Sequence, residues 1–104
     1  MDFNTFEQLF VPFCITPGFG GGKARSYYLA IRYLAEYMGL QDLSNGNVRK
    51  ILTKDGEIRN PACNFYRQLE QWLEHRHQKS YLTKGYIKAA MSYFQQFALN
   101  YQLI

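Results

Sequence analysis

Residues 27–38 read YYLAIRYLAEYM, and residues 86–97 read YIKAAMSYFQQF. Each stretch begins with Tyr and carries small, apolar or aromatic residues three, four, seven and eleven positions later. An α-helix places residues at this spacing on one stripe of its surface. The two stretches therefore predict two helices, each with an apolar face that packs into a core. We assign Tyr27 and Tyr86, the first residue of each stripe, mainly to that core.

The size and composition of the chain fit one globular domain. Its 104 residues are 47% apolar and 19% charged, which is enough apolar material to fold around a single core. No apolar run approaches the roughly 20 residues that cross a bilayer, and the first residues lack the pattern of a signal peptide. Two widely spaced cysteines, Cys14 and Cys63, suit a reducing compartment. We expect one domain over residues 1–104, located in the cytoplasm.

Capping and helix-breaking residues give approximate bounds for the other helices. Asn4 or Thr5 is expected to cap a first helix that ends before Pro12, because proline disfavours helical geometry at the preceding residue. Gly39 is a typical stop for the helix that carries the first Tyr stripe. The expected helices are residues 4–10, residues 22–38, a helix from Asn60-Pro61 to about His77, and a helix from Thr83 to Tyr101.

Residues 40–59 leave two alternatives. Ser44 or Asn45 can cap a short helix that contains Val48 and Ile51. Alternatively, two short extended segments flank Asp55-Gly56, a favoured hairpin turn. We favour the short helix followed by a small turn. The predicted fold is therefore an all-α, compact bundle of four to five helices, with the option of one short hairpin near residues 51–59.

The sequence gives little support for catalysis. Its eight carboxylates are scattered, so no cluster suggests a magnesium site. His75 and His77 are two positions apart and would point to different faces of a helix, which argues against a zinc site. Gly22-Lys23 is followed by Ala24 rather than the Ser or Thr of a phosphate-binding P-loop. We predict that the protein is not an enzyme and has no cofactor or metal.

The basic residues suggest a different chemistry. The formal net charge is +4, and a Gly-rich stretch leads into Lys23, Arg25 and Ser26 at the start of a predicted helix, where backbone N–H groups can hold a phosphate. The alternative is that the glycines form only a connector. If the two Tyr-stripe helices pack side by side, their basic starts converge, and the middle segment completes a basic face. The predicted nucleic-acid-binding residues are Lys23, Arg25, Ser26, Arg49, Lys50, Lys84 and Lys88.

Two families share parts of this pattern. The Ser26-Tyr27-x-x-Ala30-Ile31 segment and the later Tyr86 stripe resemble helical N-terminal modules of some prokaryotic restriction endonucleases. More loosely, the layout is similar to the helical core-binding domain of tyrosine recombinases. The resemblance implies a helical DNA-binding module. It implies no activity, because this chain stops where either family would begin its catalytic domain.

The resulting leading hypothesis is a small, non-catalytic, cytoplasmic DNA-binding module from a prokaryote, a phage or a mobile element. Its basic residues would contact phosphates, and binding would weaken as salt rises. The alternative is a protein-interaction module, such as a phage or mobile-element protein that inhibits a host machine, with exposed Tyr, Phe and Trp72 as its anchor. A homodimer is a third alternative. A continuous basic face favours DNA, and an exposed aromatic patch favours a protein partner.

Overall fold

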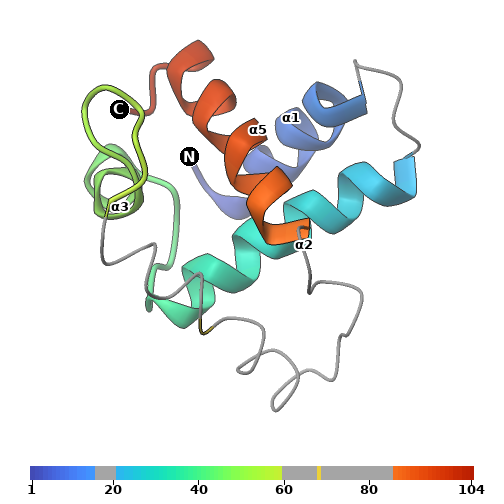
Figure 1. Cartoon of the computed structure of the whole chain (residues 1–104), viewed down its shortest axis with the longest axis horizontal. Helices are drawn as coiled ribbons and strands as arrows, with labels where there is room; N and C mark the ends of the chain where they lie inside the picture. Colours follow the sequence, from blue (N-terminus) through green and yellow to red (C-terminus); the bar gives the residue numbers. More distant parts are fainter. Residues whose placement is uncertain (16–20, 60–67, 69–85) are drawn as a thin grey trace.

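Three helices, α1, α2 and α5, pack against one another, and a short fourth helix, α3, lies at one side of them (Figure 1). The computed structural model describes residues 1–15, 21–59, 68 and 86–104, with only the backbone described for residues 21–23 and 86–88. The elements are α1 (Phe3–Ile15), α2 (Gly21–Tyr37), α3 (Asn45–Ile51) and α5 (Tyr86–Asn100). Apart from an isolated bridge between Leu52 and Ile58, the described residues contain no strand. The predicted all-α bundle is confirmed.

Helix α1 is longer than the sequence suggested. A carboxylate oxygen of Asp2 accepts a hydrogen bond from the backbone N–H of Thr5 at 2.7 Å, so Asp2 caps the helix, and the predicted cap at Asn4 or Thr5 is wrong. The predicted end before Pro12 is wrong, because α1 continues to Ile15. Proline removes one backbone donor, but the turn beyond it still packs, with Phe13 half-buried and Cys14 fully buried.

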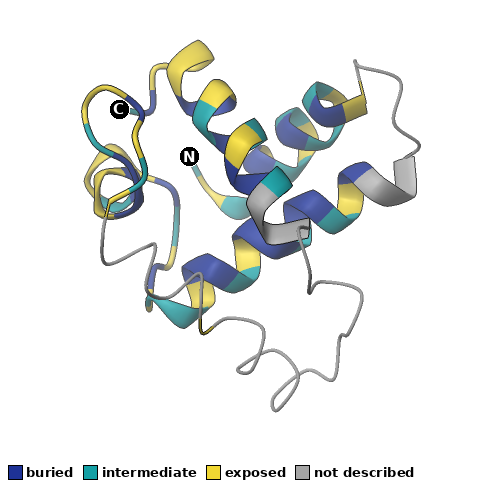
Figure 2. Ribbon diagram, viewed as in Figure 1, coloured by how far each residue is buried: buried dark blue, intermediate teal, exposed yellow. Residues whose placement is uncertain are grey.

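An aromatic cluster joins the three long helices. The Phe6 ring of α1 lies 4.7 Å from the Phe10 ring, 5.8 Å from Tyr28 of α2 and 5.4 Å from Phe97 of α5, measured between ring centroids. Phe94 meets Phe6 edge-on at 5.9 Å. Such edge-to-face and offset contacts are favourable beyond the area they bury. Figure 2 shows that the buried stretches of these helices, in dark blue, meet in the middle of the molecule.

The two Tyr-stripe helices do pack side by side. The ring of Tyr27 in α2 is stacked on the ring of Tyr93 in α5, with 5.5 Å between the centroids. Tyr27 is buried, as predicted, and so are three further members of its stripe, Ala30, Ile31 and Leu34. In α5 the buried face is rotated slightly from the predicted stripe. Its buried residues are Ala90, Met91, Phe94, Phe97 and Ala98.

Gly39 ends α2 as predicted. It has a positive φ of 75°, a conformation that glycine adopts without strain. The N–H of Gly39 donates to the Glu36 carbonyl at 3.0 Å, and the N–H of Leu40 donates to the Ala35 carbonyl at 2.8 Å. These two bonds form a Schellman motif, which satisfies carbonyls in the last turn. The chain then turns toward α3, where the N–H of Leu43 donates to the Met1 carbonyl at 2.8 Å.

Both alternatives for residues 40–59 are partly present. The short helix exists, with Ser44 at its N-cap position. A carboxylate oxygen of Asp42 accepts hydrogen bonds from the Ser44 N–H at 3.0 Å and from the Asn47 side-chain amide at 2.8 Å. After the helix, Thr53 N–H donates to the Glu57 carbonyl at 2.7 Å and closes a small turn beside the isolated bridge.

Some predictions lie outside the described residues. They are the helix from Asn60-Pro61 to His77 (apart from Gln68), the cap Thr83, the cysteine Cys63 and the aromatic Trp72. None of the described helices has the length and apolar character needed to cross a bilayer.

Replacing Phe97 with Ala should lower the free energy of unfolding by about 3–5 kcal/mol, because it removes a fully buried ring that contacts α1 and Tyr101, the residue directly after α5. Urea unfolding followed by circular dichroism measures the change. The control is Gln96→Ala at the neighbouring exposed position, which should change stability little. Equal losses in both variants would contradict the assignment of Phe97 to the core.

The Asp42 cap should make stability depend on pH. Hydrogen bonds from Ser44, and then from Asn47, hold the pKa of Asp42 below its ordinary value. A lowered pKa in the folded state stabilises the fold above the ordinary pKa of about 3.9, and this contribution is lost as the pH falls through the lowered value. Asp42→Ala should therefore be less stable than the wild type at neutral pH, with the gap narrowing below about pH 4.

Thermal or urea unfolding at several pH values tests this expectation. Glu57→Gln, which removes an exposed negative charge in the following turn, is the control. A constant gap between Asp42→Ala and the wild type across the whole pH range would show that the Asp42 charge does not stabilise α3.

Candidate nucleic-acid interface

Arg25, predicted to bind phosphate, is already engaged within the protein. It lies in the second turn of α2 and forms an ion pair with Glu7 of α1. Its guanidinium carbon also lies 5.9 Å from the centroid of the Tyr28 ring. The Arg25 side chain remains 58% exposed, so the pair is a surface ion pair of modest strength. A phosphate at this position would compete with the Glu7 carboxylate.

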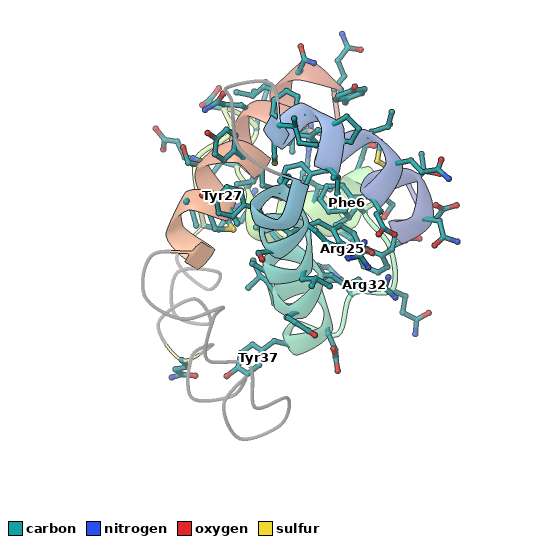
Figure 3. All side chains as sticks on the ribbon, turned by 90° about the vertical axis from the view of Figure 1, so that its right-hand side faces the viewer. Phe6, Arg25, Tyr27, Arg32 and Tyr37 are labelled. Atoms are coloured by element: carbon teal, nitrogen blue, oxygen red, sulfur yellow. The ribbon has the colours of Figure 1, made fainter. Side chains whose placement is uncertain are left out.

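A second arginine, which the sequence analysis missed, shares this face of α2. Arg32 follows Arg25 by two helical turns, and both side chains project to the same side of the helix (Figure 3). One Nη of Arg32 donates to the Tyr28 hydroxyl at 2.8 Å, and the guanidinium lies 5.0 Å from the Phe3 ring centroid. Glu7 and Glu36 lie along the same side. The side chains described here therefore balance two cations with two carboxylates.

The other predicted residues near the helix starts are only partly placed. Ser26 is half-buried on α2. Lys23 and Lys88 lie in the first turns of α2 and α5, where the structure describes only the backbone, and Lys84 lies outside the described residues. Although the two helices pack together, convergence of their basic starts stays a prediction.

Among the described residues, the clearest group of exposed cations lies on α3 and the turn that follows it. Arg49 and Lys50 occupy the last turn of α3, and Lys54 and Arg59 follow; all four are exposed. We call these four residues the basic segment. The guanidinium of Arg59 donates a hydrogen bond to the Arg49 carbonyl, which brings Arg59 back onto the end of α3. Cations at this end of a helix also suit its dipole.

The amphipathic pattern of α3 explains this placement. Val48 and Ile51 are fully buried, as is Leu52 directly after the helix, so the polar side of α3 faces outward. Figure 2 shows exposed residues, in yellow, along this outer side. Residues 42–59 contain the four cations and three carboxylates, Asp42, Asp55 and Glu57, so the net charge is 4 − 3 = +1. This side of the molecule is positive, unlike the balanced face of α2.

Two α5 side chains fix the turn of the basic segment on the core. The side-chain amide of Gln95 donates to the Gly56 carbonyl at 2.9 Å. Leu99 lies directly over Gly56, which is buried and has a φ of +85°. Neither Gln95 nor Leu99 stood out in the sequence. The Asp55-Gly56 pair gave the only signal, because it indicated a turn that needs glycine.

The structure separates two groups that the sequence analysis placed on one basic face. In Figure 1 the beginning of α2, near Arg25, lies at the right of the molecule, whereas α3 lies at the left. Arg49 and Lys50 therefore lie together with Lys54 and Arg59 and apart from Arg25. Arg25 is therefore not part of the basic segment.

The described residues offer little for thiol chemistry, metal binding or an aromatic interaction patch. Burial raises the pKa of the Cys14 thiol to about 12, so Cys14 stays protonated and unreactive at neutral pH. No group of three metal-ligating side chains occurs among the described residues. The large apolar side chains exposed in this part are Ile15, Leu99 and Tyr101. Of these three residues only Tyr101, which is 40% exposed, is aromatic. The predicted interaction patch would need exposed aromatic side chains of this kind.

Comparison with protein-family models, with curated proteins and with solved structures gives no match to this chain. The resemblance to restriction endonuclease and recombinase modules stays a prediction from the sequence.

Gly56→Ala should lower the free energy of unfolding. A residue with a Cβ at this positive φ costs about 1–2 kcal/mol, and the new Cβ would lie 3.1–3.3 Å from Leu99 side-chain atoms. Adding Leu99→Ala should relieve the close contact but not the backbone strain. The control is Gly46→Ala in the first turn of α3, where a Cβ meets nothing within 4 Å, so alanine should not destabilise the fold. Equal effects at the two glycines, measured by urea unfolding, would refute this account of the turn.

Proposed function

We propose that this protein is a small DNA-binding module, without catalysis of its own, that contacts the phosphates of duplex DNA through the basic segment. The observation that carries the proposal is the exposure of Arg49, Lys50, Lys54 and Arg59 on one short unit with buried apolar residues beneath it. Two of these residues, Arg49 and Lys50, were candidates from the sequence. A cytoplasmic setting in a prokaryote, a phage or a mobile element belongs to the same proposal and rests on the sequence.

The proposed contacts are electrostatic, so their strength depends on salt. A protein that neutralises a phosphate with Lys or Arg releases condensed counterions from the DNA. Four such contacts give a slope of log K against log salt of about −3.6, which is a loss of about 10²-fold in affinity between roughly 50 and 200 mM salt. Contacts of this kind bind duplexes of different sequence with similar affinity, because phosphates carry no direct sequence information.

The balanced face of α2 supports this choice of surface. A phosphate approaching Arg25 or Arg32 also approaches Glu7 and Glu36, and like charges repel it. The basic segment has an excess of positive charge and lies at the other side of the molecule. Lys84 and Lys88 are further candidates from the sequence, whereas Lys23, in the first turn of α2, lies on the other side of the molecule from the basic segment.

Replacing Arg49 and Lys50 together with Gln should weaken duplex DNA binding at least about tenfold at 50 mM salt and reduce the salt slope by about 1.8, because two phosphate contacts are lost. Fluorescence anisotropy with a labelled duplex at several salt concentrations measures both quantities. The control is Gln8→Glu with Gln96→Glu, which changes the net charge by the same amount at exposed positions of α1 and α5.

An equal loss of affinity in the control pair would show that net charge, rather than this surface, governs binding. Absence of wild-type binding at low salt would overturn the proposal and favour the alternative of a protein-interaction module. Circular dichroism of each variant separates loss of binding from loss of fold.

A further inference from the structure

A small hollow lies where the beginning of α1 meets the last turns of α2. It is lined by Phe3 of α1, by Arg32 and Glu36 of α2, and by Leu40 directly after that helix, and its volume is about 230 Å³. Sites for drug-sized ligands are larger, about 300–1,000 Å³. The hollow therefore has the size for a metabolite of only a few carbon atoms. The basic segment does not line it.

The Arg32 side chain is exposed, but its guanidinium has two partners within the protein. It lies against the Phe3 ring, with 5.0 Å between the guanidinium carbon and the ring centroid, and donates to the Tyr28 hydroxyl at 2.8 Å. Tyr28 is only 2% exposed, so this acceptor is itself fixed in the core. An arginine fixed in this way loses little rotamer freedom when it binds an anion. Its remaining donors suit the two oxygens of a carboxylate.

A carboxylate lines the same hollow one helical turn away. Glu36 follows Arg32 by four residues, a spacing that brings the Cβ atoms to about 5–6 Å on a helix. A carboxylate accepts several hydrogen bonds, so Glu36 can take an ammonium in addition to its other contacts. Phe3 and Leu40 supply apolar surface beside the two charges. The hollow thus combines a site for an anion, a site for a cation and an apolar wall.

We infer that this hollow binds a free zwitterionic amino acid with an aliphatic side chain. The ligand carboxylate pairs with Arg32, its ammonium pairs with Glu36, and its side chain packs on Phe3 and Leu40. One small molecule then satisfies the three features of the site. This inference stands apart from DNA binding, because the two sites share no residue.

The test is a titration of the full chain, labelled with ¹⁵N, with L-leucine. Isocaproate, which lacks the ammonium, and isoamylamine, which lacks the carboxylate, have nearly the same aliphatic group and separate the two charges. We expect saturable shifts of the amides of Phe3, Arg32, Glu36 and Leu40 with leucine, and binding about tenfold or more weaker with either analogue. Absence of saturable shifts up to the solubility limit of leucine would overturn the inference.

Glu36→Gln should reduce leucine affinity about tenfold and abolish the preference for leucine over isocaproate, because it removes only the partner of the ammonium. Glu57→Gln removes the same charge in the turn after α3 and should leave leucine affinity unchanged. Arg32→Lys keeps the positive charge but loses the planar guanidinium, so it should weaken both leucine and isocaproate. Equal binding of leucine and isocaproate by the wild type, or equal losses in the two Glu variants, would refute the zwitterion site.

Discussion

The contact of the Phe6 ring with rings from all three long helices is the interaction on which the rest of the molecule depends. Phe6 meets Phe10 on its own helix, Tyr28 on α2 and both Phe94 and Phe97 on α5. Because interiors are packed closely, this cluster fixes the relative positions of the helices. The polar contacts follow from it. Helices α1 and α2 bring Glu7 to Arg25, and α5 brings Gln95 to the turn that carries the basic segment.

Much of the fold could be predicted from the sequence because its main signals are local. The stripe from Tyr27 to Leu34 is buried as its spacing indicates, and Gly39 ends α2 with the conformation that glycine favours. The end of α1 was missed for a non-local reason. Pro12 is a local signal to stop, but aromatic packing by Phe13 onto Phe97, at 5.5 Å, sustains another turn of helix. Residues 40–59 were ambiguous because they contain a helix and a turn in succession.

The candidate sites were less predictable, since they depend on which side chains the fold brings together. Sequence alone identified Arg49 and Lys50 but could not separate them from Arg25. Only the packing of α1 on α2 shows that Glu7 pairs with Arg25. Arg32 and Glu36 looked like ordinary exposed residues of a helix. Their joint position beside Phe3 and Leu40 depends on how the first turn of α1 lies against the end of α2.

The aromatic cluster also has a consequence for the rate of folding. Helices α1 and α2 are neighbours in the chain and can meet early, but Phe94 and Phe97 come from nearly the opposite end of the sequence. Contacts between residues so far apart require the closure of a long loop before they contribute, and proteins rich in such contacts fold more slowly than bundles of sequence-adjacent helices. We therefore expect the docking of α5 to be slower than the pairing of α1 with α2. During synthesis, the parts of α1 and α2 that contact Phe94 and Phe97 can therefore be covered by these rings only after α5 has been made.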